Sequence, residues 1–205
     1  MKEAAPRTRF SMGIVWLAVL IGLTTWACGK SEAPASGGTA ASTEAVKPAP
    51  NFSGWIPYAS EEGGFSVLTP AVFAPNTETT PTDAGDIRFQ RFTAQPDFHH
   101  IYIIVVSRMP EALIAGRNPV ELLQGAREGV IGQFQGTVTS ERQMTLDGRA
   151  GLEIKVTGTS QGMSVSVVSR VYLAGNSLYQ AYVIAEKGYE DDASDRHFLD
   201  SFKLK

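Results

Sequence analysis

The pair Asp147-Gly148 stands between two segments that alternate apolar and polar residues, and it constrains the fold of this 205-residue chain more than any other feature. Both residue types accept the positive φ that the tightest two-residue hairpin requires. After the turn, Leu152, Ile154 and Val156 would share one face of a strand, and the polar residues between them the other. The pattern therefore predicts two antiparallel strands joined by a tight turn.

Other segments carry the same kind of signal. Gly175-Asn176 separates two further apolar segments and predicts a second hairpin. Short apolar runs bounded by turn-forming residues predict strands at residues 64–69, 86–94 and 99–108. Residues 75–86 are polar throughout and are predicted to be a loop.

Two segments have helical signals instead. Residues 118–134 begin with Asn118, a favourable cap, and Pro119, which suits the first helical position. Residues 191–202 are acidic at their start and apolar toward their end, which suits a terminal helix. The chain is therefore predicted to be an α+β protein, with an antiparallel sheet of about six strands packed between helices.

The first 27 residues are predicted to be a signal peptide. They are basic at the start, and the 16 residues from 12 to 27 carry no charge. A membrane-spanning helix needs about 20 apolar residues, whereas the core of a signal peptide needs about 7–15. The alternative is an uncleaved anchor formed by a slightly short helix.

Cys28 is the only cysteine, which excludes a disulfide within the chain. Thr25-Trp26-Ala27-Cys28 resembles the lipobox of bacterial lipoproteins, and the resemblance implies lipidation of Cys28. Thr25 and Trp26 depart from the usual pattern, so ordinary cleavage nearby or an unprocessed anchor are the alternatives. Gly29, by the sorting rule of such lipoproteins, implies the outer membrane of a bacterial cell envelope, facing the periplasm.

The chain is predicted to have three parts. Residues 1–27 are the signal peptide, and residues 28–51 are the lipidated cysteine followed by a flexible linker without aromatic residues. Residues 52–205 are the folded domain, which is long enough for one substantial core. The net charge of −3, without a basic block, argues against nucleic acid as a partner.

One motif raises the possibility of hydrolysis. Residues 158–162 match the G-x-S-x-G pattern around Ser160, and Asp195 and His197 follow in the order of a serine hydrolase. That mechanism needs a helix directly after the serine. The following segment is instead rich in β-branched residues, so the motif is interpreted as a hairpin turn and no catalytic residue is predicted.

Metal binding is weighed on two groups of residues. The neighbours His99 and His100 would point to opposite sides of a strand, so one ion could not easily take both. Glu78, Asp83 and Asp86 lack the dense alternation of a calcium loop. The acidic residues 190–195 are interpreted as a helix cap, and no metal or cofactor site is predicted.

Residues 60–70, 169–186 and 197–205 resemble the PsbP family. The resemblance implies an antiparallel sheet between helices, and the best-known members are non-enzymatic, extrinsic subunits of photosystem II. It implies no functional residue. We therefore expect a non-enzymatic, membrane-tethered envelope lipoprotein whose domain is a protein-interaction module. A carrier of a small ligand or lipid, with an apolar cleft between the sheet and helix 118–134, is the alternative, and a hydrolase is a third hypothesis.

Overall fold

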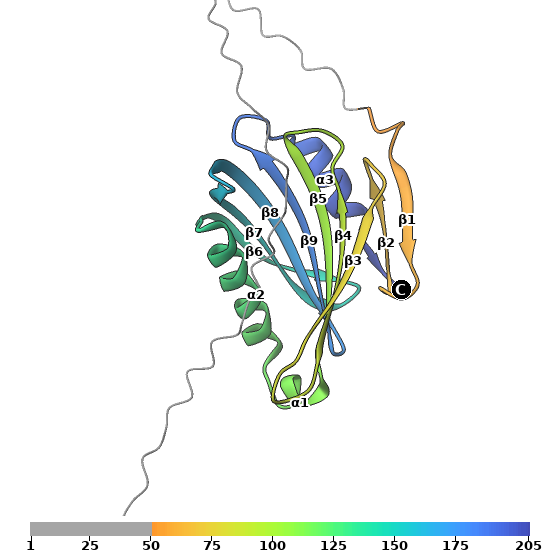
Figure 1. The fold of residues 1–205 in the computed structure, drawn as a ribbon, viewed down its shortest axis with the longest axis vertical. Coiled ribbons are helices and arrows are strands. Elements are labelled where there is room, and N and C mark those ends of the chain that lie inside the picture. Colours follow the sequence, from red (N-terminus) through yellow and green to blue (C-terminus); the bar gives the residue numbers. More distant parts are fainter. Residues whose placement is uncertain (1–50) are drawn as a thin grey trace, which may run out of the picture. The chain divides into compact units, whose positions relative to one another are not determined.

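The computed structural model describes residues 51–205, whose strands form two antiparallel sheets (Figure 1). The larger sheet has the order β3-β4-β5-β9-β8-β7-β6, and the smaller one β1-β2-β10. The larger sheet consists of β3 (Ala74–Thr80), β4 (Ile87–Ala94), β5 (His100–Arg108), β6 (Thr137–Leu146), β7 (Arg149–Ser160), β8 (Met163–Ala174) and β9 (Ser177–Glu186). The smaller sheet consists of β1 (Ile56–Ser60), β2 (Phe65–Thr69) and β10 (Lys203–Leu204). The helices are α1 (Glu111–Ile114), α2 (Pro119–Phe134) and α3 (Asp192–Ser201).

The larger sheet is built from two meanders that meet where β5 pairs with β9. Helices α1 and α2 carry the chain from β5 to the far edge, where β6 begins the second meander. Asp147 has φ 50° and Gly148 has φ 76°, and Gly175 opens the last hairpin with φ 59°. Both predicted hairpins are therefore confirmed.

Helix α2 covers β7 and β8 on one face of the larger sheet (Figure 1). Its N-terminus is capped as the sequence predicts, because the side chain of Asn118 accepts a hydrogen bond from Val120 N–H at 3.0 Å. Its C-terminus lies against β7 at Gly158, where a Cβ would collide with the carbonyl oxygen of Phe134. A bare glycine at this position lets the helix approach the strand closely.

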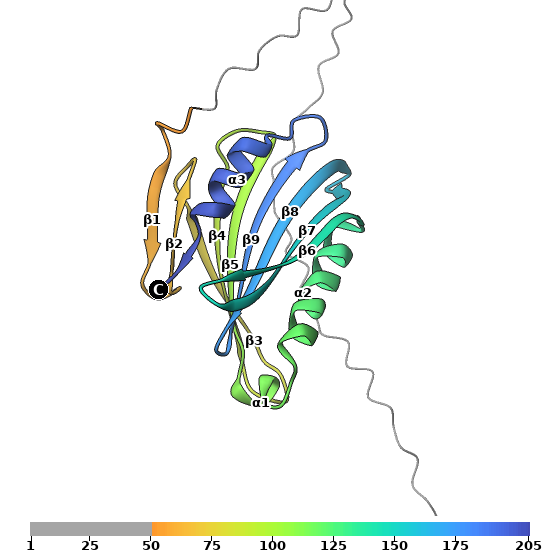
Figure 2. The same cartoon turned by 180° about the vertical axis from the view of Figure 1, so that it is seen from behind.

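Helix α3 and the smaller sheet cover the opposite face, over β4, β5 and β9 (Figure 2). The core on this side is strongly aromatic. Phe65, Phe92, Phe198 and Phe202 are buried, and the rings of Phe65 and Phe202 stack with their centroids 5.7 Å apart. The larger sheet thus lies between helices, as predicted, and the smaller sheet completes one outer layer.

The larger sheet has seven strands, which agrees with the prediction of about six, and the smaller sheet was not predicted. The prediction of a loop at residues 75–86 is wrong in part, because residues 74–80 form β3. This strand pairs only with β4 and is largely exposed. Neither of its faces therefore needs the apolar residues by which a strand is recognised in a sequence. Its Pro75 is tolerated because an edge strand has one unpaired side.

The predicted signal peptide, Cys28 and most of the predicted linker lie outside the described residues, and those assignments stay predictions. Within residues 51–205, every helix is too short or too polar to cross a membrane.

Candidate functional site: a charged cleft beside α3

A cleft of about 490 Å³ lies between α3 and strands β6, β7 and β8. Figure 2 shows α3 and the strands β6, β7 and β8, whose side chains line the cleft. Two apolar residues, Val168 and Leu199, contribute to its lining. Its cations are Arg142, Lys155, Arg170 and Arg196. Its carboxyl groups belong to Glu153, Asp192, Asp195 and Asp200.

The floor of the cleft is an ion-pair network centred on Arg170. Arg170 Nε donates to Glu153 Oε2 at 2.5 Å, and Arg170 Nη1 donates to Asp200 Oδ1 at 2.6 Å. Arg142 Nε donates to the other oxygen of Glu153 at 2.8 Å. Burial acts to raise the pKa of Glu153, but the hydrogen bonds from Arg142 and Arg170 outweigh it and lower that pKa. These charges hold one another in place.

Asp195 behaves differently from the other acidic residues of the cleft. Its residue surface is 5% exposed, and within residues 51–205 its Oδ1 has no hydrogen-bond partner. Burial is the main cause that raises its pKa to about 7, with help from Asp192 and Asp191, while His100 and Lys155 act in the opposite direction. A carboxyl group in this state exchanges a proton near neutral pH.

The structure confirms the interpretation of the acidic residues 190–195 as a helix cap for Asp191 and corrects it for the buried Asp195. Only Asp191 caps α3, by accepting hydrogen bonds from Ala193 N–H at 3.2 Å and Ser194 Oγ at 2.8 Å. Asp195 lies three and four residues before the buried Phe198 and Leu199, on the inner face of the helix. That spacing was visible in the sequence, and it was the signal that could have identified Asp195 as buried.

Two cations of the cleft are less firmly held than Arg170. Lys155 Nζ lies 3.6 Å from Asp192 Oδ1, a long ion pair at the surface. Arg196 is exposed, and it forms no ion pair with another residue of the described domain. Asp195 and Arg196 are therefore the charged groups of the cleft for which the described residues supply no ion-pair partner.

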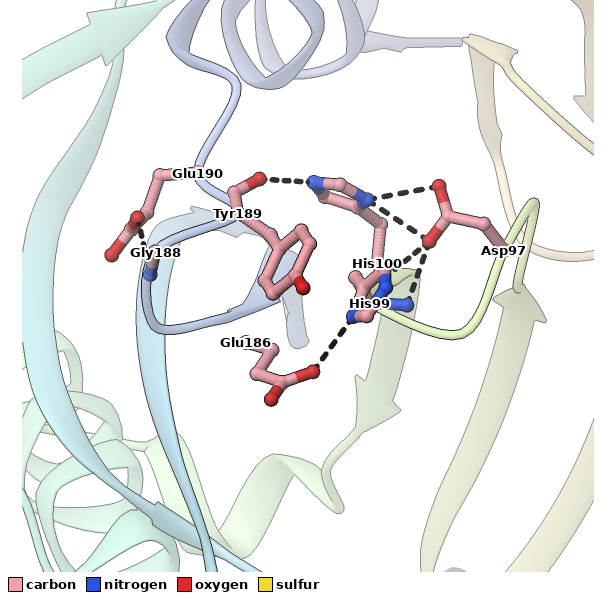
Figure 3. A network of polar contacts seen from close by, with 7 residues as sticks. All are labelled: Asp97, His99, His100, Glu186, Gly188, Tyr189 and Glu190. Carbon is pink, nitrogen blue, oxygen red and sulfur yellow. Dashed lines mark hydrogen bonds and ion pairs between the residues drawn. The ribbon is translucent and has the colours of Figure 1, made fainter. Parts of the chain in front are cut away.

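The two adjacent histidines belong to a separate polar network at one end of the larger sheet (Figure 3). His99 Nδ1 lies 2.7 Å from Glu186 Oε2, and its ring stacks on Tyr189 with centroids 3.6 Å apart. His100 lies between the carboxylate of Asp97, 3.0 Å from its Nδ1, and the carbonyl oxygen of Tyr189, 2.6 Å from its Nε2. The network attaches the segment before α3 to the hairpin between β4 and β5.

The geometry of this network indicates a structural role, in which it holds two segments of the chain together. Burial acts to raise the pKa of Asp97, but the hydrogen bonds from His99 and His100 lower it overall. The two histidines contact different carboxylates, and no cluster of three or more His, Cys, Asp or Glu residues suited to a metal ion occurs in the described domain. Glu78, from the predicted polar loop, is instead on β3, 3.9 Å from Arg91.

Ser160 lies at a turn, as the sequence predicts. It is the last residue of β7, the turn at Gln161-Gly162 follows, and β8 begins at Met163. The helix that a nucleophilic serine needs at this point is replaced by a strand. His197, the candidate base, stacks on Phe52 with ring centroids 3.8 Å apart.

The side chains between α2 and the sheet are closely packed at the place where a lipid carrier would need an apolar cleft. Leu123, Val130 and Phe134 of α2 are buried against Ile154 and Val156 of β7 in one packed core. The described cleft lies on the opposite face of the sheet, and its lining is mainly charged.

No protein-family model matches the chain, and no curated protein matches it either. Among solved structures, it is similar to cyanobacterial PsbP (CyanoP) from Synechocystis, with a TM-score of 0.51 and 11% identity over 76% of this chain and 95% of that one. LpqN from Mycobacterium tuberculosis, described as involved in cell envelope biogenesis, gives a TM-score of 0.39 and 14% identity over 74% and 90%. A Pseudomonas aeruginosa protein of unknown function gives 0.38 and 12% over 65% and 83%.

The match to CyanoP, at so low an identity, concerns the fold alone, and the other two scores are too low to support an argument. CyanoP is covered almost completely, so the similarity extends over its whole fold. The family resemblance in the sequence predicted this architecture. The described part of the chain has a PsbP-like fold.

Proposed function

We propose that this chain is a non-enzymatic lipoprotein of the bacterial cell envelope whose PsbP-like domain binds a protein partner through the charged cleft. The observation that supports this proposal is how the charged side chains of the cleft are paired and exposed. Glu153 and Arg170 are fixed by mutual ion pairs, whereas Arg142 and Asp200 extend to an exposed rim. Rigid, exposed charges of both signs favour the selection and orientation of a partner surface.

The same arrangement gives little support to catalysis. A nucleophile needs a base within hydrogen-bond reach, and Ser160 lies at a strand end followed by a second strand. The basic residues that line the cleft are arginines and a lysine, and an arginine keeps its proton at any physiological pH. An interaction surface accounts for these residues without a chemical step.

The membrane tether completes the proposal. Lipidation of Cys28 would anchor the chain at the outer membrane, facing the periplasm, because acyl chains contribute roughly 0.8 kcal/mol for each methylene buried in the bilayer. A flexible coil of residues 29–51 would then span roughly 25–30 Å on average. That reach would let the domain meet a partner in the envelope while the lipid stays in the membrane.

Site-specific photo-crosslinking in the host tests this proposal. A photoreactive amino acid replaces Arg142 at the rim of the cleft in the full-length chain, and Gln124 on the exposed side of α2 in a matched control. We expect one defined protein adduct from position 142 and none from position 124. Equal labelling from both positions, or no adduct from either, would remove the cleft as the interaction site.

A second candidate function follows from the size of the cleft. About 490 Å³ lies within the range of roughly 300–1,000 Å³ typical of small-molecule sites. Of the small ligands or lipids considered as the alternative, a polar small ligand would suit the charged lining. Native mass spectrometry of the protein from its host separates the two candidates, because a bound small molecule adds a stoichiometric mass far below that of a protein.

A further inference from the structure

The charged cleft contains one carboxyl group that the folded chain leaves unsatisfied. Asp195 is nine-tenths buried or more, and none of the described residues donates a hydrogen bond to its Oδ1. Buried polar atoms in native proteins nearly always have a partner, which can be the chain, a water molecule or a ligand. Asp195 is also among the residues that line the cleft, so a ligand bound there would lie beside this residue.

The groups around Asp195 explain why the chain itself supplies no partner. Those that face it are His100 and Tyr102 on β5, Lys155 on β7, and Asp191 and Asp192 at the start of α3. Lys155 pairs with Asp192, and the ring of His100 binds Asp97 and the backbone of Tyr189. The hydroxyl of Tyr102 is hydrogen-bonded with Ser194. These cationic and donor groups are therefore already engaged.

A lysine side chain from a ligand would suit the unsatisfied carboxyl group of Asp195. Its ammonium is a compact cation with three donors, which suits a single carboxylate oxygen, whereas the guanidinium fork of arginine suits two. The methylene stem would pack on the apolar parts of the lining, Val168 and Leu199. Next to it, the exposed Arg196, which pairs with no residue of the described domain, would attract a carboxylate.

We propose that the cleft receives a lysine side chain of the partner protein, with its ammonium on Asp195 and a neighbouring acidic residue of the same segment on Arg196. This inference rests on the proposed function and specifies the chemistry of the partner. The partner segment would carry a lysine flanked by acidic residues. The site would reject a segment with an uncharged residue in place of the lysine.

Calorimetric titration of the full chain with a synthetic peptide tests the inference. The probe is an N-acetylated, C-amidated peptide of sequence GEKEG, and the matched control carries norleucine in place of lysine. We expect the norleucine peptide to bind at least tenfold more weakly, and Asp195→Asn to bind both peptides equally weakly. A third peptide, GQKQG, keeps the lysine but has glutamine in place of both acidic residues. Arg196→Gln should weaken binding of GEKEG but leave binding of GQKQG unchanged.

The pH dependence gives a readout that a purely structural role of Asp195 would not move. Only the ionised carboxylate attracts the ammonium, and the pKa of Asp195 lies at about 7. Affinity should therefore fall about tenfold between pH 8 and pH 6, and Asp195→Asn should abolish this change. His100 faces Asp195 and acts on its carboxyl group, so His100→Asn serves as a control that should keep most of the pH dependence.

Equal binding of the lysine and norleucine peptides, or no binding of either, would overturn the inference. The crosslinking experiment separates this outcome from failure of the proposed function. If position 142 still forms a defined adduct, the interaction role of the cleft stands and only the lysine assignment falls. If position 142 forms none, both fall.

Discussion

Arg170 and Glu153 form an ion pair on the floor of the cleft, although their side chains are only 7% and 12% exposed. Moving two charges out of water is costly, and their mutual attraction offsets that cost only when the remaining polar atoms are also bonded. Here Arg142 bonds the second oxygen of Glu153, and Asp200 accepts from the second nitrogen of Arg170. The network is therefore stable as a unit and sensitive to the loss of its centre.

Replacing Arg170 should destabilise the domain strongly. Arg170→Met would leave Glu153 buried with one remaining partner, and we expect a loss of about 3 kcal/mol in the free energy of unfolding. The matched control is Arg142→Met, whose side chain is 60% exposed and should cost at most about 1 kcal/mol. Urea denaturation followed by circular dichroism measures both values. Similar losses in the two variants would show that Arg170 is not the centre of the network.

Two glycine substitutions near α2 should have opposite effects on stability. At Gly158 a Cβ would collide with backbone atoms of Phe134 and Gly136, which cannot move aside as a flexible side chain can. Gly158→Ala should therefore lower the free energy of unfolding by roughly 2 kcal/mol or more. At Gly132, in the exposed part of α2, a Cβ meets open space, and alanine should stabilise the helix by up to about 1 kcal/mol.

Thermal denaturation of both glycine variants beside the unmodified protein would measure these effects. The melting temperature should fall for Gly158→Ala and stay equal or rise for Gly132→Ala. An unchanged melting temperature for Gly158→Ala would mean that α2 can shift away from β7 without loss of packing.

The elements that could be predicted from the sequence are those with local signals. The turn at Asp147-Gly148 needs only two residues with positive φ, and the cap of α2 needs only Asn118 before a proline. The strands that were missed, β1, β3 and β10, lie in the small sheet or at the edge of the large one. Their residues face solvent or a distant segment, so no local alternation marks them.

The site was harder to predict than the fold because its residues are far apart in the chain. Arg142, Glu153 and Arg170 come from three strands whose register brings them together, and α3 adds Asp195 from the end of the sequence. Helix α3 was predicted at residues 191–202 with an apolar C-terminal part, and its buried face includes Phe198 and Leu199. Extending that face by one turn would have included Asp195, but three nearby acidic residues favoured the capping interpretation.

Cys28→Ser should release the protein from the membrane. Serine lacks the thiol that would carry lipid, and a single acyl chain already gives only marginal membrane binding, so loss of all acyl groups should leave no stable anchor. Fractionation of host cells should show the unmodified chain with the outer membrane and the variant in the soluble fraction. Intact mass spectrometry should find acyl groups on residue 28 of the unmodified chain alone. A variant that stays with the membrane would favour an uncleaved anchor.

Asp195 should make the domain less stable as the pH rises. Its pKa is 3.8 in an exposed setting and about 7 in the folded state, so between pH 4 and pH 7 the folded chain binds more protons than the unfolded one. Stability must then decrease with rising pH across that window and level off above it, by roughly 2–3 kcal/mol between pH 5 and pH 8. Glu153 and Asp97, whose pKa values are lowered, act with the opposite sign and only in more acidic solution.

Asp195→Asn tests this directly, because the amide has a similar shape and does not titrate in this range. The free energy of unfolding is measured by urea denaturation at pH 5, 6, 7 and 8 for both proteins, and the difference between the two curves isolates Asp195 from every other titrating group. We expect the difference to change by roughly 2–3 kcal/mol in favour of the variant as the pH rises from 5 to 8. A constant difference would show that the carboxyl group is already ionised at pH 5, and hence that an unsatisfied, proton-exchanging acid does not exist in the cleft.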